Sequence, residues 1–225
     1  MTYRAERGDS RSRAHSPEDK AKVRQAFIEA GRRLLGRDDS GKVSLRMIAS
    51  EAGYSPGSIY QYFHDHRELV FAIRERDMNE ATDHFDRIAK RARDPVARVR
   101  KLFLGSVQYW LAHLDHFDVL FAGPLHHPVV VSQDGVPFGQ SETVRRSYRV
   151  YYDAIDALFG SLPNRPMDTR LAADTMIATV HGIVAFPRMT PSMPWSPTTT
   201  MAECAIDALI AGWIAQSCVG NDASA

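Results

Sequence analysis

A concentration of hydrogen-bonding side chains lies between residues 54 and 67. The apolar residues Ile59 and Phe63 are four positions apart, which is the spacing of the buried side of a short helix. The remaining positions then project outward or sideways: Ser58, Tyr60, Gln61 and Tyr62. Glutamine can bind adenine through two hydrogen bonds, and serine is an adaptable donor or acceptor. The chemistry that this pattern predicts is recognition of base edges in DNA.

Groups suited to the sugar-phosphate backbone flank this segment. Ser44 and Ser55 precede two predicted helices, where free backbone N–H groups and the helix dipole attract phosphate. Gly57 allows the backbone to approach a duplex closely. The rest of the predicted DNA-binding set is Arg46, Tyr54, Pro56, His64 and Arg67. Of these, Tyr54, His64 and Arg67 are expected to clamp the DNA backbone on either side.

Two short helices joined by a turn are expected to position these side chains. The first starts after Ser44, with apolar residues at helical spacing, and Gly53 breaks it. Ser55 and Pro56 then suit the cap and first position of a second helix, which reaches about Phe63. Together they predict a helix-turn-helix, whose second helix enters the major groove of DNA. An earlier helix is expected from the cap at Ser16 to a stop at Gly36.

At these positions the chain resembles the TetR family of transcriptional regulators. The matching residues are Ser44, Ile48, Ala49, Ala52, Gly53, Ser55, Gly57, Ile59, Tyr60, Tyr62, Phe63 and Leu69. Ser44 replaces the usual Thr, Tyr54 the usual Val and Arg67 the usual Lys. The motif resemblance covers about residues 16 to 75. Helices around a glycine also occur in bundles that bind no DNA, but this stretch exposes more aromatic side chains than a purely structural helix needs.

The rest of the chain has a helical pattern, and we expect an all-α protein. Helices are predicted from His66 to about Ile88, Pro95 to Leu114, Phe117 to Phe121, Ser141 to Phe159, Asp168 to Phe186 and Thr198 to Ser217. Residues 123–139 and 187–197 are rich in proline or glycine and are expected to be loops. The predicted organisation is a basic arm over 1–15, a DNA-binding domain over 16–68, a ligand-binding and dimerisation domain over 69–218, and a tail over 219–225.

Composition limits the class of protein. The chain has 225 residues, 44% of them hydrophobic, two cysteines and a net charge of +1. Residues 1–76 hold 15 basic and 11 acidic side chains, so the near-neutral total hides a charge of +4 there and −3 in the remainder. The composition is that of a folded protein, and no apolar run approaches the roughly 20 residues of a membrane helix. Few cysteines favour a reducing cytoplasm.

The family resemblance implies a C-terminal domain that binds a small-molecule effector, a homodimer formed by the last two helices, and a palindromic operator in double-stranded DNA. A repressor released by a largely apolar or aromatic ligand is expected. Candidate residues of the ligand pocket are Phe85, Phe103, Val107, Trp110, Phe117, Phe121, Tyr148, Tyr152, Met176 and His181. Candidate residues of the dimer interface are Met176, Val180, Val184, Met201, Ala205, Leu209 and Trp213. Core packing is the alternative role for each of them.

Enzymatic and metal chemistry have less support. His113 and His116 are three residues apart with Asp115 between them, and this spacing could hold a metal. Because the sequence offers no cysteine cluster and no second His/Glu pair beside them, no metal is predicted. The sequence has no GxSxG, HExxH, Walker or Rossmann pattern, so neither an enzyme nor a cofactor is expected. A helical enzyme that uses the histidines, and a binding module without DNA binding, remain the alternatives.

Overall fold

The computed structural model describes residues 16–36, 43–121 and 131–219, and its regular elements in these ranges are all helices. This confirms the predicted all-α class. The predicted arm over 1–15 lies outside the described residues, as do residues 220–225 of the predicted tail. Among the described helices, none is long and apolar enough to cross a membrane. The chain divides into two compact units, and the boundary falls within one helix, after Ile73.

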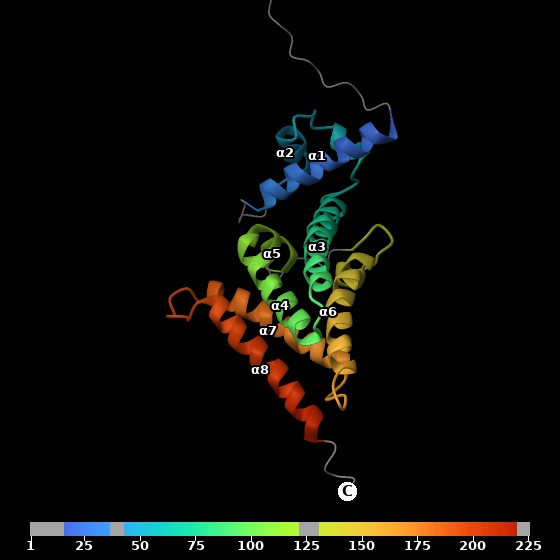
Figure 1. The fold of residues 1–225 in the computed structure, drawn as a ribbon. Helices are drawn as coiled ribbons and strands as arrows, with labels where there is room; N and C mark the ends of the chain where they lie inside the picture. The colour runs from blue at the N-terminus through green and yellow to red at the C-terminus, as the bar shows by residue number, and fades with distance from the viewer. Residues whose placement is uncertain (1–15, 37–42, 122–130, 220–225) are drawn as a thin grey trace, which may run out of the picture. The chain divides into compact units, whose positions relative to one another are not determined.

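The first unit contains α1 (Pro17–Leu35), α2 (Leu45–Glu51), a short 3-10 helix η1 (Ser58–Gln61) and the start of α3 (His66–Arg91). In Figure 1 these elements run from blue to teal. Ser16 caps α1 by accepting a hydrogen bond from the backbone N–H of Asp19, with Pro17 in the first helical position. Ser44 caps α2 in the same way, through the N–H of Met47. Both starts agree with the sequence-based prediction, because capping depends on local residues alone.

The second helix of the predicted helix-turn-helix is shorter than expected. The sequence predicts a helix that begins at Pro56 and reaches Phe63, but the structure has a single 3-10 turn over Ser58–Gln61, preceded by Gly57 with no side-chain cap. Carbonyl Ile59 O accepts from both Tyr62 N and Phe63 N, each at 2.9 Å, and the chain leaves the turn there. So short a segment cannot sustain an α-helix by itself. Packing of Ile59 and Phe63, both fully buried, holds it instead.

The second unit contains the remainder of α3 together with α4 (Pro95–Ala112), α5 (Leu114–Phe121), η2 (Phe138–Gln140), α6 (Glu142–Gly160), α7 (Thr169–Met189) and α8 (Thr198–Val219). Helix α4 packs against α6, α7 and α8 (Figure 1). Its side chains Leu102, Phe103 and Trp110 are at most 1% exposed and form the centre of the core. Burial of such large apolar groups is the main source of stability in this unit.

Several helix ends in this unit differ from the prediction. Helix α4 stops at Ala112, because His113 leaves the helical conformation, and α5 starts at Leu114. Helix α7 continues past Pro187 to Met189, although the sequence places Pro187 at the start of a loop. Proline lacks the N–H that would bond to the carbonyl four residues earlier, and α7 ends two residues after Pro187.

Candidate functional site

The first unit is built around the residues expected to read DNA. Ile48 from α2, Ile59 from η1 and Phe63 after it are all 0% exposed, so the predicted buried side of the helix-turn-helix is present. Gly53 joins α2 to the turn with a φ of 78°, a conformation that side chains with a Cβ rarely adopt. The N–H of Tyr54 then donates to the carbonyl of Ala49 at 2.9 Å, which closes the end of α2.

Phe27 of α1 supports two of the predicted DNA-binding tyrosines. Its fully buried ring packs edge-on against the rings of Tyr54 and Tyr62, at centroid distances of 5.2 and 5.4 Å. Both tyrosines are half-buried, and burial raises the pKa of the Tyr62 hydroxyl. These rings therefore have a structural role that the sequence did not reveal, and each is only partly accessible.

Most of the predicted DNA-binding residues are accessible. Those in the exposed class are Ser44, Arg46, Ser55, Pro56, Gly57, Tyr60, Gln61, His64 and Arg67. Tyr60 leaves half of its surface in solvent, which is unusual for a large aromatic side chain. Ser58 is half-buried, and its hydroxyl donates to the carbonyl of Ser55 at 2.7 Å. Its oxygen can still accept a hydrogen bond, but its proton is already used.

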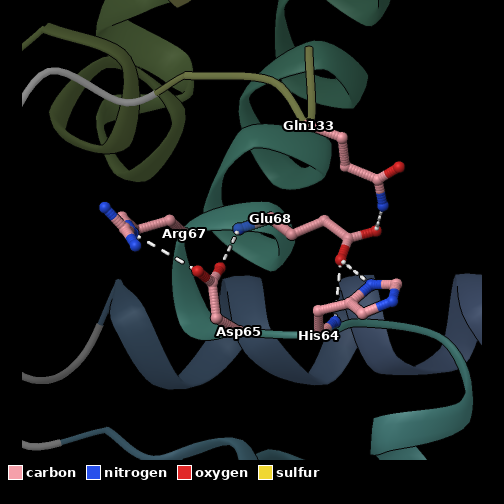
Figure 2. Close-up of polar contacts among 5 residues, drawn as sticks. All are labelled: His64, Asp65, Arg67, Glu68 and Gln133. Atoms are coloured by element: carbon pink, nitrogen blue, oxygen red, sulfur yellow. Dashed lines mark hydrogen bonds and ion pairs between the residues drawn. The ribbon is translucent and has the colours of Figure 1, made fainter. Parts of the chain in front are cut away.

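The start of α3 carries a set of polar contacts that the sequence analysis missed. Asp65 accepts from the backbone N–H of Glu68 at 2.9 Å and from Nε of Arg67 at 3.3 Å. Oε2 of Glu68 accepts from the backbone N–H of His64 at 2.7 Å and lies 3.0 Å from Nδ1 of its ring. Gln133, which belongs to the same unit, donates to Oε1 of Glu68 at 2.5 Å (Figure 2).

These contacts change the electrostatics of the expected phosphate clamp. His64 and Arg67 are each paired with a carboxylate of the chain, so part of their attraction for phosphate is already satisfied. Hydrogen bonding from the N–H of Glu68, together with the nearby Arg67, lowers the pKa of Asp65 and keeps it ionised. The spacing of Asp65 and Glu68 resembles a capping box and was visible in the sequence. No sequence pattern indicated the contact between Gln133 and Glu68.

A groove in the second unit brings together some of the predicted ligand-binding residues. It has a volume of about 880 Å³, and its polar walls include Tyr148, Tyr152 and His181. Val144, Ile177 and Ala178 supply apolar surface, while Glu142, Arg145, Arg149, Arg170 and Asp174 make the lining more polar than expected. The volume is in the range of small-molecule sites.

Two of the three predicted polar residues of this groove, Tyr152 and His181, are held by neighbouring side chains. Tyr152 donates to Oδ1 of Asp174 at 2.8 Å, and burial together with this hydrogen bond raises the pKa of Tyr152 to about 12. The ring of His181 lies 4.6 Å from that of Phe121 and 5.8 Å from that of Phe117. Burial lowers the pKa of His181 to about 4, so its imidazole is neutral at pH 7.

The other predicted pocket residues lie elsewhere. Phe85, Phe103, Val107, Trp110, Phe117 and Met176 are at most 1% exposed and belong to the core, and they are not among the residues that line the groove. Phe121 is 41% exposed. The rings of Phe85, Trp110 and Phe117 pack in an edge-to-face cluster. Core packing, the alternative that the sequence left open, therefore describes them in this structure.

The predicted dimer interface needs a similar correction. Met176, Val180, Val184 and Trp213 are at most 3% exposed within the single chain, so they have almost no surface left to bury against a second copy. Met201, Ala205 and Leu209 are half-buried. The exposed side of α8 instead carries small residues at helical spacing, Cys204, Ala208, Ala211 and Ala215, and the exposed side of α7 carries Leu171, Phe186 and Met189.

Comparison with known proteins relates the first unit to a described family. Residues 27–73 match the family model described as "Bacterial regulatory proteins, tetR family". Over 136 residues, the chain is 25% identical to the HTH-type transcriptional regulator SAB2452 of Staphylococcus aureus (strain bovine RF122 / ET3-1), which covers 60% of this chain and 68% of that protein.

Solved structures share the fold over most of the chain. FadR of Bacillus subtilis, solved in complex with stearoyl-CoA, superposes with a TM-score of 0.68 and 13% identity over 84% of this chain and 98% of FadR. SmeT, the repressor of the Stenotrophomonas maltophilia multidrug efflux pump SmeDEF, superposes with a TM-score of 0.60 and 19% identity over 84% of this chain and 89% of SmeT.

Proposed function

We propose that this chain, which belongs to the TetR family of transcriptional regulators, is a repressor that a small molecule releases from a palindromic operator. It binds double-stranded DNA as a homodimer and works in the cytoplasm. The observation that carries the proposal is the exposure of Tyr60 and Gln61 on a turn whose other side is anchored by the buried Ile59 and Phe63. A rigid support with exposed polar groups is what direct reading of base edges requires.

The contacts within the first unit suggest which residues read bases and which contact phosphates. Tyr60 and Gln61 read bases, because they are exposed and no structural role within the unit explains them. Ser44, Arg46 and Arg67 contact phosphates and set the register of the protein on the duplex. Arg67 exchanges part of its pairing with Asp65 for phosphate, so its net contribution to affinity is smaller than that of an unpaired cation. His64 likewise exchanges its contact with Glu68 for phosphate.

A homodimer is supported by the exposed surface of α7 and α8. One helix-turn-helix contacts few base pairs, and dimers of such modules bind two half-sites about 34–36 Å or a multiple apart. The exposed side of α8, with Ala208, Ala211 and Ala215, has the small residues that permit close helix packing, and Leu171 and Phe186 of α7 are 58% and 51% exposed. We expect a second copy of the chain to cover these exposed side chains.

The effector is proposed to bind in the groove lined by Tyr148, Tyr152 and His181. FadR of Bacillus subtilis, which shares the fold, was solved with stearoyl-CoA, so a helical unit of this kind can accommodate a long apolar chain. Here the mixed lining favours a ligand that combines an apolar or aromatic part with hydrogen-bonding groups. Such a ligand releases DNA by binding more tightly to a conformation that does not fit the operator.

The test begins with selection of binding sites from random duplexes by the full-length chain, followed by gel-shift titration. The substitution Tyr60→Ala or Gln61→Ala should weaken operator binding by about 5- to 150-fold, since a bidentate base contact contributes about 1–3 kcal/mol. Gln25→Ala is the matched control, because Gln25 is an exposed glutamine on α1 outside the predicted set. Sequence-specific binding that survives both test substitutions in a folded protein would refute the proposed reading residues.

A further inference from the structure

Two pairs of possible metal ligands meet inside the second unit. Asp77 and Glu80 are three residues apart on α3, whereas His113 forms the break between α4 and α5 and His116 lies in the first turn of α5. Ligand atoms of Asp77, Glu80 and His116 lie within 4.8 Å of one another, and so do those of His113, Asp115 and His116. Because His116 belongs to both groups, the five side chains form one cluster.

The centre of this cluster is removed from solvent. Asp77 is 0% exposed and His116 is 1% exposed, whereas Glu80 and Asp115 are in the exposed class. A divalent metal ion is a large local charge, and it would interact strongly with a carboxylate in such a buried position. The exposed Glu80 and Asp115 give the buried centre a side through which an ion can enter.

Tyr109 supplies the outer contact that metal-binding histidines usually have. Its hydroxyl lies 3.5 Å from Nδ1 of His116, and its ring packs against that of His113 at 4.4 Å. A histidine that binds a metal commonly holds its second nitrogen in a hydrogen bond, which fixes the ring. Because Nδ1 faces Tyr109, Nε2 is the nitrogen that would bind an ion, and it lies 3.9 Å from Oδ2 of Asp115.

We propose that this cluster binds one divalent transition-metal ion, with Zn²⁺ as the representative, through Asp77, Glu80 and His116, and with His113 or Asp115 as a further ligand. Imidazole and carboxylate donors together suit Zn²⁺ and its transition-metal neighbours, whereas Mg²⁺ and Ca²⁺ prefer oxygen alone. A tetrahedral site needs its ligand atoms about 3.4 Å apart, so separations of up to 4.8 Å would have to shorten by up to about 1.4 Å. Rotation of the exposed Glu80 and Asp115 side chains can provide part of this movement.

The sequence-based expectation of no metal rested on the lack of a second ligand pair beside His113 and His116. The fold supplies that pair from α3, more than thirty residues earlier in the chain. The proposal does not depend on the operator or on the ligand groove, so its failure would leave the proposed function untouched.

The test uses the untagged full-length chain, stripped with a chelator and titrated with Zn²⁺, and with Co²⁺ as a spectroscopic probe. We expect one Zn²⁺ per chain by mass spectrometry and visible absorption bands of Co²⁺ in a site with nitrogen and oxygen ligands. At a Zn²⁺ concentration about 100 times Kd, the melting temperature should rise by about 5–10 °C. No saturable binding by the folded, stripped chain would overturn the proposal.

Variants locate the site. His116→Ala removes the shared ligand but empties a buried position, so Glu80→Gln and His113→Asn, at exposed and half-buried positions, serve as milder substitutions. Each should weaken Zn²⁺ binding by at least about 10-fold while circular dichroism stays that of the wild type. Glu203→Gln, which removes an exposed carboxylate on α8, is the matched control and should bind normally. Undiminished binding by the folded double variant Glu80→Gln/His113→Asn would show that the metal lies elsewhere.

Discussion

Replacement of Asp65 by alanine should destabilise the start of α3, the helix that follows the proposed reading turn. The carboxylate of Asp65 accepts from the backbone N–H of Glu68 at 2.9 Å and pairs with Arg67 at 3.3 Å. Loss of such a cap costs about 0.5–2 kcal/mol, and loss of a negative charge at a helix N-terminus about 0.3–1 kcal/mol more. The pair with Arg67 adds little, because both side chains are at least half exposed.

The expected sum for Asp65→Ala is therefore about 1–3 kcal/mol of unfolding free energy, or roughly 2–12 °C in melting temperature for a chain of this size. Asp65→Asn is the matched control, because asparagine caps helices about as well as aspartate but carries no charge. It should cost only about 0.3–1 kcal/mol. Thermal and urea unfolding followed by circular dichroism give both values.

Lowering the pH separates the contribution of the Asp65 charge from that of its capping hydrogen bond. The pKa of Asp65 is below its usual value because the N–H of Glu68 donates to the carboxylate. The unfolded chain therefore binds this proton more readily, so the stabilisation by Asp65 is complete above a pH of about 4 and is lost as the pH falls through the lowered pKa. The difference in unfolding free energy between the wild type and Asp65→Ala should therefore become smaller in acid. The difference in unfolding free energy between Asp65→Asn and Asp65→Ala should stay the same. If the unfolding free energy of the wild type exceeded that of Asp65→Ala by the same amount at pH 7 and pH 3, this account would be contradicted.

Two further predictions concern the second unit. Ala211→Arg places a charge on the exposed side of α8 and should convert the proposed dimer to a monomer, which light scattering would detect as a halved mass; an unchanged mass would place the interface elsewhere. His181 has a pKa lowered to about 4, so the folded state resists its protonation, and stability should fall by at most about 3 kcal/mol as the pH drops from 6.5 to 4. Urea unfolding of His181→Phe should show a weaker pH dependence, and an identical one would refute this role for burial.

The parts of the fold that depend on neighbouring residues could be predicted from the sequence. Ser16 and Ser44 cap their helices as expected, and Gly53 makes the turn with a positive φ. The pattern of Ile59 and Phe63 correctly gave the buried side of the reading turn. Its helical type was wrong, because a segment this short takes its conformation from packing.

Features that depend on contacts between residues far apart in the chain could not be predicted from the sequence. Phe85 and Trp110 have residue types that suit a ligand pocket and a core equally, and only the packing assigns them to the core. Among the residues chosen for the dimer interface, Met176, Val180, Val184 and Trp213 are already buried inside the chain, whereas Met201, Ala205 and Leu209 are half-buried. Asp77 and Glu80 had no visible relation to His116 until the fold brought α3 and α5 together.

One hydrogen bond of the first unit can form only after the ribosome has synthesised Gln133. Its contact partner Glu68 lies 65 residues earlier in the chain. At about 5–20 residues per second, the ribosome needs roughly 3–12 s after residue 73 to reach residue 133. During that interval the nascent first unit lacks the hydrogen bond that Gln133 makes to Glu68. A fragment cut at the boundary after Ile73 lacks it permanently, so such a fragment is an incomplete substitute for the reading unit of the whole protein.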